Sequence, residues 1–233
     1  MRLTFLPVLI LFCFPLSAQN LVRNPDFETK TACPDNLGQI RLAVYWESPN
    51  PGTPDYFNDC SGNPDYGTEF NKKGGQIPYS GHAYAGLQYH NINRNEYYEY
   101  LRTELASPLE SGRAYCIKAY VSLGNSSYAL REFGVVVSQT ELRSATTQRL
   151  KLPYTALSDG NILSDTEGWM CLSGVYHAKG GEKYLTFGDF APVRNFVQIN
   201  PESRDSIFMS TYYFVDDISL ESLVDSVGCM CPR

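Results

Sequence analysis

Short segments in which apolar and polar residues alternate limit most strongly how this chain can fold. The segment 97–105 places aliphatic and small residues on one face and aromatic or charged residues on the other, namely Leu101, Thr103 and Leu105 against Tyr98, Tyr100, Arg102 and Glu104. An alternation with a period of two is typical of a β-strand with one face in the core and one in water. Similar patterns predict strands at 114–124, 133–139, 168–178, 183–190 and 212–220. The sequence Lys179-Gly180-Gly181-Glu182 indicates a hairpin between two of them.

The chain outside these segments contains frequent turn residues and no helical pattern. Gly and Pro punctuate it about every ten residues, and no long stretch keeps a 3.6-residue apolar period. The regions 34–82 and 140–167 are rich in Pro, Gly, Asn, Asp and Ser, which predicts surface loops. The sequence therefore predicts an all-β protein with one large domain.

The N-terminus has the pattern of an export signal. Arg2 precedes an apolar run from Leu3 to Leu16, and Ser17-Ala18 supplies small residues before a cleavage point. Cys13 follows two large residues, which disfavours a lipoprotein cleavage site. No later segment approaches the roughly 20 apolar residues of a transmembrane helix. We therefore expect a signal peptide at 1–18, a domain at 19–223 and a cysteine-containing tail at 224–233, with the product secreted or held at the cell surface or outer membrane.

Six cysteines remain after the expected cleavage. An even number of cysteines in an exported chain predicts disulfides among Cys33, Cys60, Cys116, Cys171, Cys229 and Cys231. Cys33 with Cys60 is the preferred pair, because both lie in loop-like sequence that a crosslink would stabilise. Free buried thiols are the alternative for Cys116 and Cys171, which sit inside apolar strand patterns.

Charge and motifs disfavour two classes of function. Acidic residues outnumber basic ones by 25 to 19, and Lys and Arg are scattered, which argues against nucleic acid as a partner. The three histidines lie in unrelated contexts, and the chain has neither a metalloprotease helix pattern nor a Gly-x-Ser-x-Gly nucleophile elbow. We expect a protein that is not an enzyme.

Several motifs, taken in order, resemble those of known exported modules. An opening "NLVRNPDFE", a turn leading into "GRAYCIKAYVSL" and a closing "FVDDISL" together resemble the jelly-roll sandwich of galactose-binding-like domains and carbohydrate-binding modules. More narrowly, "TPDYFNDC", "SGHAYAG" and "SGVYHAKGGEKYLTFGDF" resemble a module that precedes OmpA-like domains in exported Gram-negative proteins. The resemblance implies a jelly-roll β sandwich with the opening and closing motifs side by side. The sequence stops at Arg233 without an OmpA-like domain, so peptidoglycan binding is not implied.

The same resemblance implies a structural Ca²⁺ ion. In such modules the Glu of the opening motif and an Asp of the closing motif ligate one ion, and here these are Glu28 and either Asp216 or Asp217. Carboxylate oxygens are the ligands that Ca²⁺ prefers, and the ion would neutralise acidic residues within a sheet. Alternation places Asp216 and Asp217 on opposite faces, so only one is expected to face the ion. The alternative is that Glu28 caps local backbone amides or pairs with a Lys or Arg, while both aspartates are solvated.

An aromatic surface with polar neighbours is what a sugar ligand requires. Aromatic rings cover the C–H face of a pyranose, while charged or amide groups bond its hydroxyls. The expected ligand residues come from the water-facing side of 97–105, the neighbouring strand and one loop, namely Tyr98, Tyr100, Arg102, Lys118, Tyr120 and Trp46. Tyr56 and Trp169 are further candidates. We therefore expect a non-catalytic module that binds a glycan or other cell-surface component, with a structural or adhesion module acting through protein contacts as the alternative.

Overall fold

The computed structural model describes residues 19–92, 95–192, 195–199, 209–223 and 228–231. The signal peptide expected at 1–18 lies outside the described residues, as do 224–227 and 232–233 of the expected tail. Within the described part of the chain, no helix has both the length and the apolar character needed to cross a lipid bilayer.

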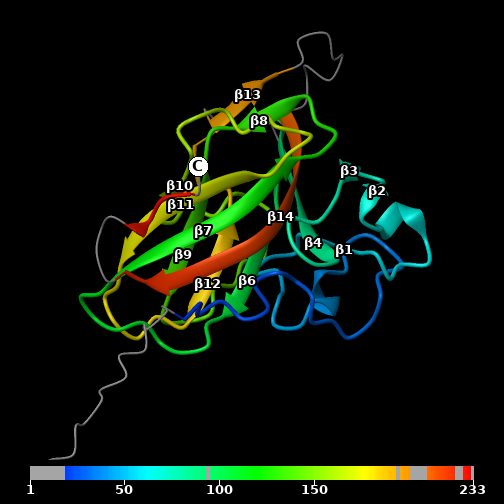
Figure 1. The fold of residues 1–233 in the computed structure, drawn as a ribbon. Helices are drawn as coiled ribbons and strands as arrows, with labels where there is room; N and C mark the ends of the chain where they lie inside the picture. Colours follow the sequence, from blue (N-terminus) through cyan, green and yellow to red (C-terminus); the bar gives the residue numbers. More distant parts are fainter. Residues whose placement is uncertain (1–18, 93–94, 193–194, 200–208, 224–227, 232–233) are drawn as a thin grey trace, which may run out of the picture.

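Two antiparallel sheets form the layers of a β sandwich (Figure 1). The six-stranded sheet has the order β1-β4-β14-β7-β11, with β5 also beside β4. Its strands are β1 (Asp55–Asn58), β4 (Ala83–Ile92), β5 (Asn95–Tyr98), β7 (Ala114–Leu123), β11 (Met170–His177) and β14 (Met209–Ser222). The four-stranded sheet has the order β10-β9-β12-β6, with β6 (Tyr100–Glu104), β9 (Phe133–Ser138), β10 (Thr155–Leu157) and β12 (Tyr184–Gly188). The predicted all-β jelly-roll sandwich is confirmed.

Smaller elements complete the described structure. Two strand pairs lie outside the sandwich, namely β2 (Glu69–Asn71) with β3 (Gly74–Gln76) and β8 (Tyr128–Leu130) with β13 (Phe196–Gln198). The short 3-10 helices are η1 (Ile40–Leu42) and η2 (Pro64–Tyr66). The β2–β3 hairpin lies beside β1 and β4 in Figure 1. The region 34–82 is therefore more than a surface loop, since it also supplies β1, whose four residues are buried.

The core lies between the two sheets and follows the predicted alternation. In β7, Tyr115, Ile117, Ala119 and Val121 belong to the main core cluster. They meet aromatic residues of the other sheet, among which Phe133 and Phe187 stack with ring centroids 4.9 Å apart. Burial of this apolar face is the main favourable contribution to folding of such a sandwich.

The opening and closing motifs lie side by side, as predicted. The amide of Leu21 donates to the carbonyl of Leu220 at 2.9 Å, and the amide of Ile218 donates to the carbonyl of Pro25 at 3.1 Å. The Asn20 side chain accepts a bond from the Leu220 amide at 3.0 Å. Residues about 200 positions apart thus close the sandwich along one edge of β14.

The expected single strand at 97–105 is divided between the two sheets. β5 pairs with β4 and β6 pairs with β12, so the chain crosses from one sheet to the other at Glu99. The expectation that Tyr98, Tyr100 and Arg102 face water is wrong, because they are 0%, 0% and 1% exposed. The segment after β9 covers the outer face of β6, where the Leu150 amide donates to the Tyr100 hydroxyl at 2.9 Å.

The expected hairpin at 179–182 is instead a crossover. β11 pairs with β7 in one sheet, while β12 pairs with β6 and β9 in the other. Gly180 and Gly181 adopt positive φ angles of 100° and 82°, which supports a turn there as predicted. The Glu182 carboxylate accepts hydrogen bonds from the Lys179 and Gly180 amides at 2.7 and 2.8 Å. These two bonds stabilise the turn to which Glu182 belongs.

All six cysteines of the expected mature chain form disulfides. The preferred pair Cys33–Cys60 is confirmed. Cys116 bonds to Cys229 and Cys171 to Cys231, so the alternative of free buried thiols is wrong. The last two bonds fasten the C-terminal tail to β7 and β11 of the six-stranded sheet.

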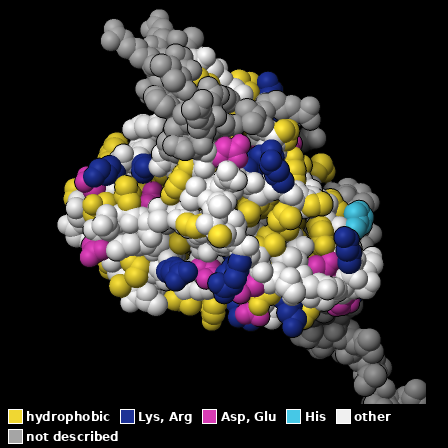
Figure 2. Space-filling model, turned by 180° about the vertical axis from the view of Figure 1, so that it is seen from behind, with side chains coloured by type: hydrophobic (Ala, Val, Ile, Leu, Met, Phe, Trp, Pro, Cys, Tyr) yellow, Lys and Arg dark blue, Asp and Glu magenta, His cyan; other side chains and the backbone are white. Residues whose placement is uncertain are grey.

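Charged side chains are mixed on the surface. On the face seen in Figure 2, Lys and Arg lie among Asp and Glu and do not gather into one basic tract.

Candidate functional site

A pocket of about 430 Å³ lies beside the free edge of the four-stranded sheet. We call it the Arg102 pocket, after the arginine that ties its walls together. Its lining residues come from the loop before β1, from β6, from the segment after β9 and from β12, and they are Arg41, Tyr45, Trp46, Glu47, Glu104, Glu141 and Tyr184.

Backbone pairing positions the loop wall of this pocket. Glu47 and Arg102 exchange two backbone hydrogen bonds, of 3.0 and 2.8 Å, which adds one residue of extended chain to the edge of β6. Trp46 is 2% exposed, and its indole N–H donates to the Asn24 carbonyl at 2.7 Å. The Trp46 ring packs on Phe27 with centroids 4.9 Å apart. Because both contacts hold the loop against the sandwich, the wall is largely preformed.

Arg102 joins the walls by its side chain. Its guanidinium is buried and forms ion pairs with the carboxylates of Glu47 and Glu141, and it also donates to the Leu142 carbonyl. The side chains of Glu47 and Glu141 are 38% and 30% exposed, so both carboxylates also reach the pocket side. A buried arginine with this many acceptors fixes geometry more strongly than a surface pair does.

Two tyrosines give the pocket aromatic surface. Tyr45 is 54% exposed, and the Arg23 guanidinium lies 5.2 Å from its ring centroid. Its φ angle is +74°, a left-handed conformation that is unusual for a bulky residue and costs about 1 kcal/mol or more. Tyr184, in β12, lies opposite Glu104 of β6 in the sheet register. Strained residues are often found at binding sites, where their orientation matters more than local stability.

Guanidinium and carboxylate groups lie close together in and beside this pocket. Arg41 lies 3.8 Å from Glu47, and Arg143 lies 2.8 Å from Glu141. Arg41 lines the pocket with Glu47, Glu104 and Glu141, whereas Arg102 is buried and Arg143 pairs with Glu141 from outside the lining. A hydroxyl both donates and accepts hydrogen bonds, so adjacent guanidinium and carboxylate groups suit a polyhydroxylated, uncharged ligand.

The structure brings only part of the predicted ligand set to this pocket. Trp46 lines it and Arg102 organises it, whereas Tyr98 and Tyr100 lie in the core. Lys118 and Tyr120 are half-buried on the outer face of the six-stranded sheet, where Tyr120 stacks on Tyr79 at 3.7 Å.

The two further aromatic candidates also lie away from the pocket. Tyr56 is fully buried and donates to the Phe27 carbonyl. Trp169 packs near Tyr79, with ring centroids 6.3 Å apart, on the outer face of the six-stranded sheet. The predicted aromatic surface therefore does not form one continuous platform.

Sequence reasoning missed six of the lining residues, namely Arg41, Tyr45, Glu47, Glu104, Glu141 and Tyr184. The pair Tyr45-Trp46 in a loop is a local signal for Tyr45, because adjacent aromatic residues in a turn-rich stretch suggest one buried anchor and one exposed ring. Glu141 has no such signal. It reaches the pocket only because the segment after β9 folds back over β6.

The expected calcium ligands surround the loop at 79–82. Asp216 is fully buried, and its carboxylate accepts bonds from the amides of Tyr79, Ser80 and Asp217 at 3.0, 3.2 and 2.8 Å. Burial raises the pKa of Asp216 to about 8. This carboxylate is already saturated by backbone donors, which leaves Asp217 as the better of the two metal-ligand candidates.

Asp217 and Glu28 are close enough to repel each other electrostatically. Burial first, and then the neighbouring charges of Asp26 and Glu28, raise the pKa of Asp217. A β-bulge follows Asp216, and Asp217 has a φ of +44°, which interrupts the expected simple alternation. Glu28 accepts a bond from the His82 amide at 2.6 Å. The alternative role of Glu28 as a cap of backbone amides is therefore present in this structure. The solvation of both aspartates that went with it is wrong, because Asp216 is fully buried.

Whether Ca²⁺ fits near Glu28 and Asp217 depends on how many side-chain oxygens are available as ligands. Among the described residues, no three His, Cys, Asp or Glu side chains are arranged to hold a metal by themselves. A Ca²⁺ ion here would therefore have to take most of its six to eight oxygens from backbone carbonyls or water.

Comparison with known proteins gives structural neighbours only. No protein-family model matches the chain, and a search of curated proteins finds no match. The CBM22-1 xylan-binding domain of Paenibacillus barcinonensis Xyn10C is 13% identical, with a TM-score of 0.44 over 86% of this chain and 93% of that domain. The K3 cleaved adhesin domain of Lys-gingipain from Porphyromonas gingivalis is 16% identical, with a TM-score of 0.41 over 87% of this chain and 96% of that domain. Our assignment of the β sandwich rests on the strand pairing described above.

Proposed function

We propose that this chain is an exported, non-catalytic module that binds a neutral carbohydrate in the Arg102 pocket. The observation that carries the proposal is the exposed Tyr45 ring next to arginine and glutamate side chains in one preformed pocket. The ring offers a face for the C–H side of a sugar, and the charged groups offer partners for its hydroxyls. The three disulfides suit the oxidising compartments that an exported protein enters.

Replacing Tyr45 with alanine is expected to weaken glycan binding about tenfold, which corresponds to about 1.4 kcal/mol of lost aromatic contact. Isothermal titration with an oligosaccharide that the unmodified protein binds measures the change. Tyr45→Phe keeps the ring and is expected to bind within about threefold of the unmodified protein, since only the hydroxyl is lost.

Tyr79→Ala is the matched control. Tyr79 is also an exposed tyrosine, at 42%, but it lies on the outer face of the six-stranded sheet. If Tyr79→Ala abolishes binding while Tyr45→Ala binds normally, the sugar site is on the other sheet and the assignment to the Arg102 pocket is wrong.

We also propose that Ca²⁺ stabilises the module through Glu28 and Asp217. The support is the group of neighbouring carboxylates near the junction of the opening and closing motifs. A cation there would remove their mutual repulsion and link residues near the two ends of the domain. Glycan binding would depend on it only indirectly, because the Arg102 pocket does not include these residues.

Chelation is expected to lower the melting temperature if the ion binds the folded state alone. Scanning calorimetry in excess calcium and in excess chelator measures the difference. Asp217→Asn removes the charge while asparagine tolerates the left-handed backbone at this position, so the variant should fold and lose most of the chelator sensitivity. Equal melting temperatures with calcium and with chelator for the unmodified protein would leave Glu28 as a backbone cap only.

A further inference from the structure

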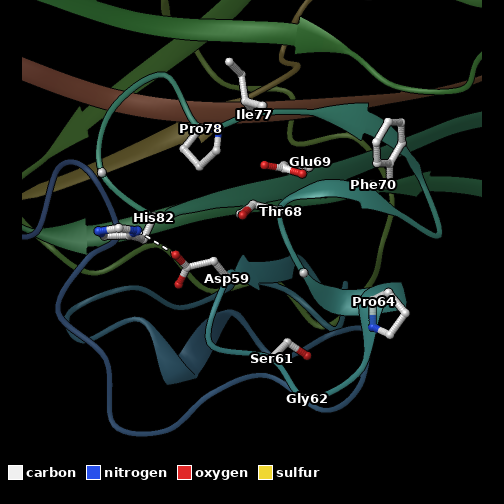
Figure 3. A pocket seen from close by; sticks show the side chains of 12 residues that line it. Asp59, Ser61, Gly62, Pro64, Thr68, Glu69, Phe70, Ile77, Pro78 and His82 are labelled. Carbon is white, nitrogen blue, oxygen red and sulfur yellow. Dashed lines mark hydrogen bonds and ion pairs between the residues drawn. The ribbon is translucent and has the colours of Figure 1, made fainter.

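A second cavity, larger than the Arg102 pocket and separate from it, has no role in the function proposed above. It has a volume of about 710 Å³ and lies between the β2–β3 hairpin and the loops at 59–62 and 77–82 (Figure 3). We call it the hairpin pocket.

One wall of the hairpin pocket is apolar and open to solvent. Phe70 is 77% exposed and Ile77 is 62% exposed, which makes them the two most exposed large apolar side chains among the described residues outside the C-terminal tail. Figure 3 shows Ile77 and Pro78 along one side of the pocket and Phe70 at its end. Apolar groups gathered at a cavity mouth are characteristic of a surface that a partner covers.

The hairpin that carries this wall is fixed to the sandwich. The Asn125 amide donates to the Lys73 carbonyl at 2.8 Å, and the Gln76 side chain donates to the Ser122 hydroxyl at 2.6 Å. Tyr84 donates to the Gln76 carbonyl at 3.0 Å. These contacts hold the apolar wall in place before any ligand arrives, which lowers the ordering cost of binding.

The pocket also carries negative charge. Its ionisable lining residues are Asp59, Glu69 and His82, and it has no lining Lys or Arg. His82 lies 2.6 Å from Asp59, so even a charged His82 would offset only one carboxylate. Glu69 has a φ of +72°, a strained conformation for a non-glycine residue, and its carboxylate points into the pocket in Figure 3.

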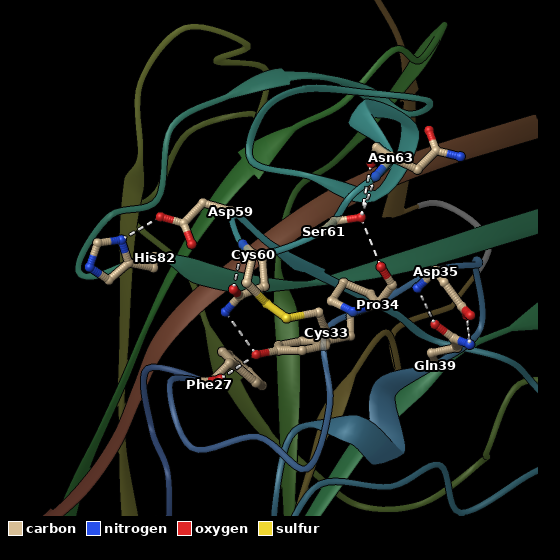
Figure 4. Close-up of a disulfide and its surroundings, with 12 residues drawn as sticks. Phe27, Cys33, Pro34, Asp35, Gln39, Asp59, Cys60, Ser61, Asn63 and His82 are labelled. Atoms are coloured by element: carbon tan, nitrogen blue, oxygen red, sulfur yellow. Dashed lines mark hydrogen bonds and ion pairs between the residues drawn. A yellow bond between two sulfur atoms is a disulfide. The ribbon is translucent and has the colours of Figure 1, made fainter.

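Hydrolytic chemistry does not explain these residues. Ser61, His82 and Asp59 line one cavity, but the Ser61 hydroxyl donates to the carbonyls of Pro34 and Asn63 at 2.8 and 2.9 Å and not to His82 (Figure 4). A nucleophilic serine needs a base within hydrogen-bond reach of its hydroxyl. The Cys33–Cys60 disulfide next to Ser61 adds rigidity to this side of the pocket.

We propose that the hairpin pocket binds an organic cation with an apolar stem, and specifically a lysine side chain of a protein partner. The methylene stem would pack on Phe70 and Ile77, and the ammonium group would lie near Glu69. A protein is the favoured source because the exposed Phe70 at the rim would be covered by the surface that carries the lysine. The proposal does not depend on glycan binding.

Isotope-edited NMR titration of the exported chain with n-hexylammonium chloride tests the ligand class. We expect saturable shifts of the amides at 68–70 and of the Ile77 amide, with n-hexanol binding at least fivefold more weakly because it lacks the charge. Glu69→Gln should weaken hexylammonium binding about fivefold, the effect of about 1 kcal/mol from one partly solvated charge. Asp65→Asn is the matched control, because Asp65 belongs to the same region but pairs with Lys72.

The remaining results separate the outcomes. Equal binding of hexanol, or shifts confined to other parts of the protein, would overturn the cation site. A peptide with a central lysine should bind at least as well as hexylammonium, and its Nε-acetyl form should not. If hexylammonium binds and the lysine peptide does not, the protein partner is wrong. Tyr45→Ala should leave hexylammonium binding unchanged, so failure of the glycan proposal is recognised separately.

Discussion

Replacing Arg102 with methionine is expected to lower the free energy of unfolding by about 3 kcal/mol. Methionine fills much of the same volume but removes the cation that Glu47, Glu141 and the Leu142 carbonyl share. The carboxylates of Glu47 and Glu141 are partly exposed, so water can solvate them once the cation is gone. The expected cost therefore lies at the lower end of the range for breaking a buried ion pair. Urea unfolding followed by tryptophan fluorescence measures the change.

Arg143→Ala is the control for this prediction. Arg143 also pairs with Glu141, but its side chain is 74% exposed, so its removal is expected to cost less than about 1 kcal/mol. If both variants unfold at the same urea concentration, Arg102 does not organise the pocket as described. Arg102→Met should also weaken glycan binding, because the segment after β9 loses its anchor to β6.

Stability is expected to fall as the pH rises from 5 to 8, in part because of Asp189. Burial raises the pKa of Asp189 to about 7 from an ordinary value of 3.8, and bonds from Asn195 and Ala191 offset only part of this effect. The folded protein therefore keeps a proton that the unfolded chain has released. The resulting stability is fully present below about pH 4 and is lost as the pH rises through 7, a change on the order of 2 kcal/mol between pH 5 and 8.

Asp189→Asn tests the predicted direction of this pH dependence of stability. The amide oxygen can replace Oδ1, which accepts both bonds, and the NH₂ group takes the place of Oδ2, which has no partner among the described residues. We expect the variant to be more stable than the unmodified protein at pH 8 and to show a flatter dependence on pH. Glu99 and Asp216, whose pKa values burial also raises to about 7 and about 8, leave a residual slope. Asp159→Asn, at an exposed loop position, should keep the original slope; an Asp189→Asn variant that does the same would contradict the assignment.

Much of the fold could be predicted from the sequence, because the patterns that indicate it lie within single strands or loops or near the two ends of the domain. Alternation in β7 identified the inward residues. The resemblance of the opening and closing motifs to jelly-roll modules implied that they lie side by side, and the bond from Leu21 to Leu220 agrees with this. The Cys33–Cys60 pair followed from two loop cysteines that a crosslink would stabilise. The strand faces and the disulfide were inferred from the sequence near the residues concerned, and the motif placement from the resemblance; each is confirmed.

The burial of Tyr98, Tyr100 and Arg102 could not be predicted from the local sequence in this way. Alternation separates the two faces of a strand, but it does not tell whether a distant segment covers the outer face. Here the strand changes sheets at Glu99, and the segment after β9 folds over β6. The density of large residues on both faces was the available signal, since a strand buried on both sides carries few small polar residues.

The crossover at 179–182 illustrates a related limit. Two glycines between strand patterns predict a tight turn, and a turn is present. Whether the strands on either side then pair depends on the packing of both against the rest of the sandwich, and here β11 and β12 join different sheets. The Arg102 pocket could not be predicted from local sequence for the same reason, because its walls come from four separate parts of the chain.

A glycan-array screen of the exported chain, run beside Tyr45→Ala, tests the central claim most directly. Our account predicts that the unmodified protein binds at least one class of neutral oligosaccharide and that the variant, at the same concentration and with the same melting temperature, loses most of that signal. Folded protein that binds no glycan on the array, or a Tyr45→Ala variant with an unchanged binding profile, would contradict the account.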